Sequence, residues 1–233
     1  MDEKIFIPVL ILSGIAIITF TSVYFSKKNV VLRKLSKFKH KRIAQFRTNE
    51  PTKITGKVLP VEEPFVAPFS QRKCVAYDFY VKQRVSTGKS SHWKTLVKKE
   101  NIQDFFIEQN GELVMVKPSM ETSNYISFMV ADKKVSSGSF NSPTPKFKEV
   151  LISLGVENKN WLGFNKTLKY TERIIEIGET ITVGGIAKWK SLNKPVAGYS
   201  FSKIAALESN KDQKIIITDH PSAITPVDRG VLI

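Results

Sequence analysis

The hydrophobic positions form two contrasting patterns along the chain, and the first is a continuous apolar run. Residues 5–25 carry no charge, and a bilayer core of about 30 Å needs about 20 helical residues to cross it. Pro8 lies near the start of the run, where its missing N–H costs little. Tyr24 and Phe25 end it with aromatic side chains, which favour the membrane interface. The pattern predicts one N-terminal transmembrane helix.

A cleaved signal peptide is the main alternative for this run. Such a peptide has a basic n-region, a shorter apolar core of about 7–15 residues and small residues at the cleavage site. Here the run is longer, it follows Met1-Asp2-Glu3-Lys4, and no Ala-x-Ala sequence comes after it. A retained anchor over residues 1–26 therefore fits the sequence better.

The second pattern is short alternating stretches rich in β-branched and aromatic residues, which are typical of strands. They cover residues 53–59, 74–81, 93–98, 105–108, 113–116, 126–130, 168–176, 180–189, 205–207 and 214–218. Asn110-Gly111 predicts a type I′ hairpin turn, and residues 145–154 have helical spacing with Gly155 as the terminator. Gly184-Gly185 within a strand predicts a bulge or a close backbone approach.

Strands of this length with turns every 8–12 residues predict a mainly β domain with a few helices, either a barrel or a sandwich. A single small helix among the strands suits a barrel, and an OB-like barrel in particular. We expect this domain to cover residues 51–220, followed by a C-terminal tail over residues 221–233. The soluble region is therefore expected to be β-rich and attached directly behind the apolar helix.

Charge gives the orientation of the anchor. The chain has a net charge of +15, and residues 1–50 hold 10 Lys or Arg against 3 Asp or Glu. The cations that follow the apolar run over residues 27–50 include Lys27, Lys28, Arg33, Lys34, Lys37, Lys39, Lys41 and Arg42. Because cytoplasmic flanks of membrane helices are enriched in Lys and Arg, we expect the N-terminus outside and the C-terminal domain in the cytoplasm.

The segment from Val30 to Phe46 also has helical periodicity, and two interpretations of it stay open. In the first, this basic juxtamembrane segment lies on the membrane surface, where each cation near anionic lipid adds about 1 kcal/mol. In the second, it extends the anchor and packs on the domain, so that its charges serve topology alone. Nucleic acid is not expected as a partner, because the basic stretch is held beside the bilayer.

Candidate chemistry is sparse. Cys74 is the only cysteine, so no intramolecular disulfide can form and a reducing compartment is indicated. The three histidines match no zinc spacing, and no familiar catalytic or phosphate-binding motif is present. We therefore expect no metal, no cofactor and no enzymatic activity. A buried structural thiol is favoured for Cys74 over a nucleophile, and His92 is interpreted as a solvated residue in a turn.

Glu172 lies in a predicted strand and has two interpretations. It is either a solvent-facing carboxylate, or a buried acid that accepts hydrogen bonds from backbone, Tyr or Arg groups and fixes a turn. Both are structural, and both are favoured over catalysis.

Several segments in order resemble the GIDE, or "beside a membrane", domain of MULAN-type mitochondrial E3 ubiquitin ligases and their prokaryotic relatives. The resemblance covers about residues 52–220. It rests on Thr55-Gly-Lys-Val58, Ala67-Pro68 with Ser70, Cys74-Val-Ala-Tyr77, Trp93, Phe105-Phe-Ile107, Gly111, Val114-Met-Val-Lys-Pro118, Tyr170-Thr-Glu-Arg-Ile-Ile-Glu-Ile-Gly178, Thr182-Val-Gly-Gly-Ile-Ala187 and Ile215-Ile-Ile-Thr-Asp219. The resemblance implies structural roles for Cys74, Tyr77, Tyr170, Glu172, Gly178 and Gly185.

In that family the domain is followed by a second transmembrane helix and a RING, which binds two zinc ions through eight Cys/His ligands. Four Cys and His residues in this sequence cannot supply them, so ubiquitin transfer is not carried over. The resemblance implies a membrane-anchored interaction domain on the cytoplasmic face that binds an unidentified protein partner. The alternatives are a RING-less adaptor in protein ubiquitination and a hydrolase that uses Cys74 or His92.

Overall fold

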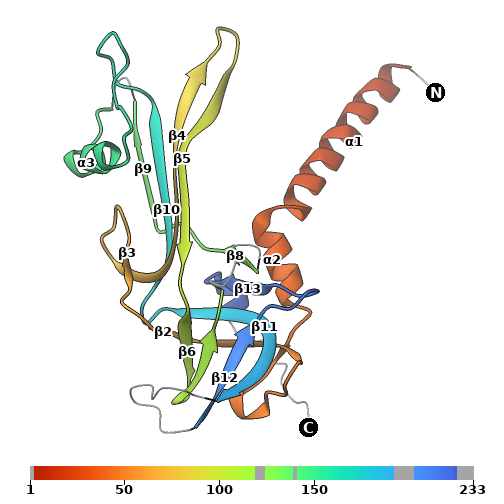
Figure 1. Cartoon of the computed structure of the whole chain (residues 1–233). Helices are drawn as coiled ribbons and strands as arrows, with labels where there is room; N and C mark the ends of the chain where they lie inside the picture. Colours follow the sequence, from red (N-terminus) through yellow and green to blue (C-terminus); the bar gives the residue numbers. More distant parts are fainter. Residues whose placement is uncertain (1–2, 119–123, 139–140, 192–201, 225–233) are drawn as a thin grey trace.

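The computed structural model describes residues 3–118, 124–138, 141–191 and 202–224, with side chains from residue 11 onward. Helix α1 (Glu3–Tyr24) stands away from a mainly β body that consists of a barrel and a half-barrel (Figure 1). The other elements are α2 (Lys27–Leu35), β1 (Lys39–His40), the 3₁₀ turn η1 (Ile43–Gln45), β2 (Pro51–Pro60), β3 (Phe65–Val66), β4 (Lys73–Ser86), β5 (Ser91–Ile102), β6 (Phe105–Gln109), β7 (Glu112–Val116), β8 (Tyr125–Phe128), β9 (Lys133–Ser137), α3 (Pro145–Ser153), β10 (Leu168–Glu176), β11 (Thr180–Ser191), β12 (Lys203–Glu208), β13 (Ile215–Thr218) and α4 (Pro221–Ile224).

Five strands close the barrel in the order β2, β6, β7, β12, β11 and back to β2. The pairing of β7 with β12 is parallel, whereas the other four pairings are antiparallel. Successive side chains point to opposite faces of these strands, and one face of each strand lies in the barrel core. Among the side chains on that face, Ile54, Ile107, Ile181 and Leu207 are fully buried. The predicted barrel is therefore confirmed.

The half-barrel is a second sheet in the order β3, β4, β10, β9, with β5 paired to β4. Helix α3 covers its inner face, where Phe147 and Leu151 pack against Phe79 and Tyr170. Thr144 caps the helix by accepting a hydrogen bond from Phe147 N, and the predicted helix over residues 145–154 is confirmed. The half-barrel rises from the barrel on long strands, so its far end lies well away from the barrel (Figure 1).

Three glycines in the barrel strands lie so close to neighbouring atoms that a larger side chain would not fit. A Cβ on Gly56 would clash with the carbonyl oxygen of Glu108, and one on Gly184 would lie 2.8 Å from Leu35 Cδ1. At Gly185 a Cβ would lie 3.2 Å from Glu208 O. The glycine pair in β11 therefore marks a close approach and not a bulge. The register shifts in the sheets lie at Val81/Lys82 and Ile175/Glu176 instead.

Helix α1 has almost no packing partners among the residues described. Its large apolar side chains are more than half exposed at most positions, for example 65% at Leu12 and 54% at Ile15. Among residues with described side chains, no single helix is long and apolar enough to cross a bilayer. The segments Ile11–Tyr24 and Lys27–Leu35 meet the length and hydropathy requirement together, but they are bent by 57° at the break.

The segment after the bend differs from the long helix that its periodicity predicts. Helix α2 ends at Leu35, and the apolar residues beyond it pack on the barrel from irregular backbone. Phe38 lies with Val31 and Leu35 against Ile216 of β13. Ile43 and Phe46 enter the barrel core itself. The apolar side of residues 30–46 therefore packs on the domain, as the second interpretation has it.

Three local predictions are wrong or incomplete. His92 lies in strand β5, because the hairpin turn is confined to the polar residues before Ser91. The strand predicted over 126–130 is β8 and ends at Phe128. The two-residue strands β1 and β3 carry too few residues to show an alternating pattern, and β9 was not predicted because Lys133, Lys134, Ser136 and Ser137 leave it a single apolar residue. The predicted tail over 221–233 begins with α4, and residues 225–233 of it lie outside the described residues.

Candidate functional site

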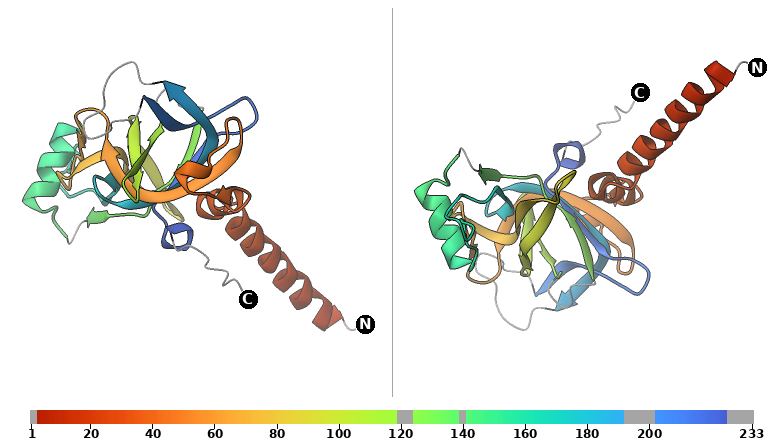
Figure 2. Two further views of the ribbon diagram at one scale, coloured as in Figure 1. Left: turned by 90° about the horizontal axis from the view of Figure 1, so that it is seen from below. Right: turned by 90° about the horizontal axis from the view of Figure 1, so that it is seen from above.

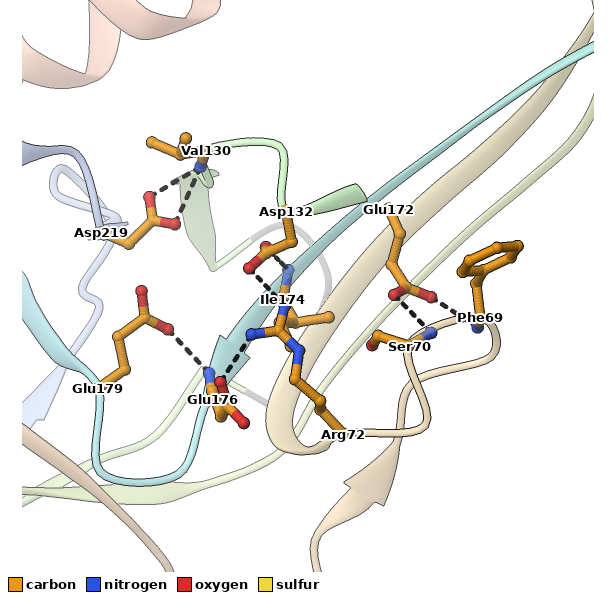
Figure 3. Close-up of polar contacts among 10 residues, drawn as sticks. All are labelled: Phe69, Ser70, Arg72, Val130, Asp132, Glu172, Ile174, Glu176, Glu179 and Asp219. Atoms are coloured by element: carbon orange, nitrogen blue, oxygen red, sulfur yellow. Dashed lines mark hydrogen bonds and ion pairs between the residues drawn. The ribbon is translucent and has the colours of Figure 1, made fainter. Parts of the chain in front are cut away.

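Glu172 is a buried residue of the half-barrel that holds a surface loop, residues 67–72, in place. Alternation along β10 turns Tyr170 and Glu172 inward, and Glu172 is fully buried. Its carboxylate accepts hydrogen bonds from Phe69 N at 2.8 Å and from Ser70 N at 3.0 Å (Figure 3). It also accepts one from the Tyr170 hydroxyl at 2.8 Å. Because a buried carboxylate is tolerated only when it is fully hydrogen-bonded, these contacts fix the 67–72 loop. This is the arrangement that the second interpretation of Glu172 describes.

Arg72, at the end of that loop, links three separate segments. Its guanidinium donates to Asp132 Oδ1 at 2.6 Å and to Glu176 Oε2 at 2.8 Å. The other oxygen of Asp132 accepts from Ile174 N at 2.9 Å. The ion pair with Asp132 raises the pKa of Arg72 further. The charge of Arg72 is therefore satisfied within the fold (Figure 3).

A cleft of about 670 Å³ opens beside this loop, and we call it the basic cleft. It is lined by Phe69, Ser70, Arg72, Asp132, Lys133, Lys134, Val135, Thr144 and Lys146. The amines of Lys133 and Lys146 lie 6.0 and 5.2 Å from the centre of the Phe69 ring. Among the described residues, Lys133, Lys134 and Lys146 form no ion pair.

The basic cleft thus presents three exposed lysines, and Phe69 beneath them is buried in the core of the half-barrel. Cationic side chains around a partly apolar surface are complementary to acidic protein segments. The residues come from the 67–72 loop, from β9 and from the first turn of α3, which are up to about 80 positions apart in the sequence. No local pattern could have brought them together, and sequence reasoning missed the cleft for that reason.

Two carboxyls, those of the half-buried Glu179 and the buried Asp219, lie where the half-barrel joins the barrel. Glu179 Oε2 accepts from Glu176 N at 2.9 Å, and burial raises the pKa of Glu179 to about 7. Both oxygens of Asp219 accept from Val130 N at 2.9 Å, and burial raises the pKa of Asp219 to about 6. Ionisation of either group is therefore less favourable in the folded chain than in the unfolded chain.

We expect Glu179 to lower the stability of the chain as the pH rises from about 4.5 to 7, because a raised carboxyl pKa means that folding favours the protonated form of that group. Replacing Glu179 by Gln removes this ionisation and keeps an oxygen for Glu176 N. The expected result is a gain of about 1 kcal/mol at pH 8 and little change at pH 4. Urea unfolding of the detergent-solubilised chain at both pH values measures it. Equal pH dependence in the two chains would contradict it.

The remaining structural positions from the resemblance are buried or sit in turns. Cys74 is fully buried, and desolvation raises the pKa of its thiol to about 12, which is unsuited to a nucleophile at neutral pH. Tyr77 accepts a hydrogen bond from Asn101 Nδ2 at 2.6 Å. Gly178 has a φ of +83° in the turn between β10 and β11. His92 lies on β5, on the exposed surface, and carries no sign of catalysis.

The eight basic residues predicted to lie at the membrane surface differ in their exposure and in their contacts. Six of the eight are exposed: Lys27, Lys28, Lys34, Lys37, Lys39 and Arg42. Arg33 lies 4.0 Å from the Tyr24 ring centre and donates to Tyr24 O at 3.1 Å, which ties α2 to the end of α1. Lys41 pairs with Glu50 at 2.6 Å. The segment therefore packs through its apolar side and keeps most of its cations in solvent.

No family model, no curated protein and no solved structure matches this chain.

Proposed function

We propose that this chain is a membrane-anchored, non-enzymatic interaction domain that binds a protein partner near the bilayer. The observation that carries the proposal is α1, an apolar helix that projects from a folded body with its large side chains exposed (Figure 1). Exposed apolar surface of this extent is unfavourable in water and marks a membrane or protein contact. A helix without a polar face is typical of a membrane-buried segment.

The cations at the base of α1 support a cytoplasmic orientation. They follow the helix on its C-terminal side, and six of them remain exposed after the segment has packed on the barrel. An exposed basic flank next to a membrane helix favours retention on the cytoplasmic side and attraction to anionic lipid. The basic segment after α1 can thus contact the domain through its apolar side and the membrane surface through its charged side.

The fold supports the OB-like part of the proposal. The barrel has five strands, and the half-barrel is built from two excursions: β3, β4 and β5 lie between β2 and β6, whereas β9, helix α3 and β10 lie between β7 and β11. OB-like barrels have five strands in a Greek-key arrangement and commonly act as binding platforms. Because one fold hosts many functions, this supports a binding role only together with a site.

The basic cleft is the site that we assign to the partner. Its three exposed lysines favour an acidic segment of a protein, and Glu172 holds the adjoining 67–72 loop in place. The described residues lining it include no nucleophile paired with a base. A binding role therefore fits its chemistry better than a catalytic one.

The test is photo-crosslinking in native membranes with a photoreactive residue at Lys134. In the otherwise unchanged chain we expect an adduct whose crosslinked segment is rich in Asp and Glu. The Lys133→Glu/Lys146→Glu variant should lower the adduct yield at least about tenfold, since opposing charges become like charges. The matched control, Lys57→Glu/Lys211→Glu, reverses two exposed lysines outside the cleft. Equal losses in both variants, or no loss in either, would contradict the assignment.

A further inference from the structure

The loop after α3 displays a group of apolar side chains that the fold leaves uncovered. Trp161 is 91% exposed, Leu162 57% and Phe164 64%. Ile152, on the outer side of α3, is 66% exposed. Among the described residues after Phe25, these four are the most exposed large apolar side chains. We call residues 158–165 the aromatic loop.

The aromatic loop is built to hold these side chains outward. Asn160 Oδ1 accepts from Leu162 N at 3.0 Å and from Phe164 N at 2.9 Å. Asn160 N donates to Phe164 O at 2.9 Å, and Gly163 takes a φ of +84° to close the turn. The turn satisfies several of its own backbone groups, which lowers the cost of placing it in a less polar environment.

The position of the aromatic loop relates it to α1. Figure 1 shows the loop between α3 and β10 at the far end of the half-barrel, on the side of the molecule toward which α1 rises. Seen from above and below, α1 and the lobe with α3 extend to opposite flanks of the barrel (Figure 2). A bilayer crossed by α1 would therefore meet the molecule at a second, laterally distant point.

The composition of the loop suits the interface of a bilayer. Trp is enriched at the depth of lipid headgroups, and a Leu and a Phe beside it add apolar surface for the acyl boundary. Lys159, within the loop, is exposed, and Lys166, at its base, lies 3.5 Å from Glu157. Cations beside exposed aromatic residues are attracted to anionic lipid headgroups.

We propose that the aromatic loop inserts Trp161, Leu162 and Phe164 into the interface of an anionic bilayer and forms a second membrane contact. This inference rests on the proposed anchoring by α1. Two contacts on opposite flanks fix the tilt of the domain and so the direction in which the basic cleft faces. A domain held by α1 alone could rotate about the bend at residues 25 and 26.

The test uses the full chain in vesicles of zwitterionic and anionic lipid, with lipids brominated near the headgroup as quenchers. Trp93→Phe/Trp189→Phe leaves Trp161 as the single tryptophan. Trp93→Phe/Trp161→Phe leaves Trp189, which is 39% exposed and donates to Phe46 O at 3.0 Å on the barrel. We expect blue-shifted emission and at least threefold stronger quenching for Trp161 than for Trp189, and a weaker effect without anionic lipid.

Alkaline extraction of the same vesicles separates the two proposals. If the chain stays in the vesicles and Trp161 emits as in water without quenching, the second contact is refuted and the anchor stands. A Trp161 signal that shifts only when a membrane-protein extract is added would show a protein on the loop and would also refute the bilayer contact. If the chain leaves the vesicles on extraction, both proposals fail.

Discussion

Replacing Glu172 by Gln will lower the free energy of unfolding by about 3 kcal/mol. The carboxylate accepts hydrogen bonds from two buried donors, Phe69 N and the Tyr170 hydroxyl, and from the part-buried Ser70 N. Gln has nearly the same shape, but its amide nitrogen is itself a donor. One of the three donors is then left facing another donor in a buried site, and the 67–72 loop must move away.

Two readouts on the full chain in detergent test this result. The urea midpoint should fall, and the thiol of Cys74, which is fully buried, should react at least about tenfold faster with a thiol reagent because the half-barrel opens more often. Glu157→Gln is the matched control, since its side chain is 86% exposed, and should change stability by less than about 0.5 kcal/mol. A Glu172→Gln chain as stable as the unmodified one would show that the carboxylate does not hold the loop.

Replacing Leu12 and Ile15 by Arg will prevent integration of α1 into the membrane. Each arginine near the centre of a membrane helix costs about 2.5–3.5 kcal/mol. Two of them shift the insertion equilibrium by roughly 10³- to 10⁵-fold. Both positions are more than half exposed on α1, so the substitutions do not disturb the described packing of the domain.

Alkaline extraction of membranes from cells that express the chain measures this effect. Most of the Leu12→Arg/Ile15→Arg chain should appear in the soluble fraction, whereas Leu12→Ile/Ile15→Leu, which keeps the apolar surface, should remain in the membrane pellet. Size-exclusion chromatography confirms that the released chain is folded. Retention of the double-arginine chain in the pellet would mean that α1 is not the anchor.

Local patterns predicted much of the fold because many elements depend on nearby residues. Strand β10 occupies the predicted residues 168–176, and the helix at 145–154 differs by a single residue at its end. The Asn110-Gly111 turn has positive φ at both residues, as a type I′ turn requires. In each case the residues that decide the structure are adjacent in the chain.

Predictions failed where distant contacts decide the structure. Phe38, Ile43 and Phe46 continue the helical spacing of α2, but α2 ends at Leu35 and these side chains pack on the barrel from the segment beyond it, in which Ile43 begins the 3₁₀ turn η1. The closure of the barrel joins Thr55 to Thr182, whose hydroxyls hydrogen-bond at 2.8 Å, and no local pattern encodes that pairing. The basic cleft and the aromatic loop escaped prediction because their significance lies in exposure and position, which only the folded chain defines.

Substituted-cysteine labelling in intact cells tests most directly whether the chain crosses the membrane with its domain in the cytoplasm. The buried Cys74 gives the background. An impermeant maleimide should label Asp2→Cys before the cells are permeabilised. It should label Glu112→Cys, at the exposed β6–β7 turn, only afterwards. Labelling of Glu112→Cys in intact cells, or protection of Asp2→Cys until permeabilisation, would contradict the proposed topology.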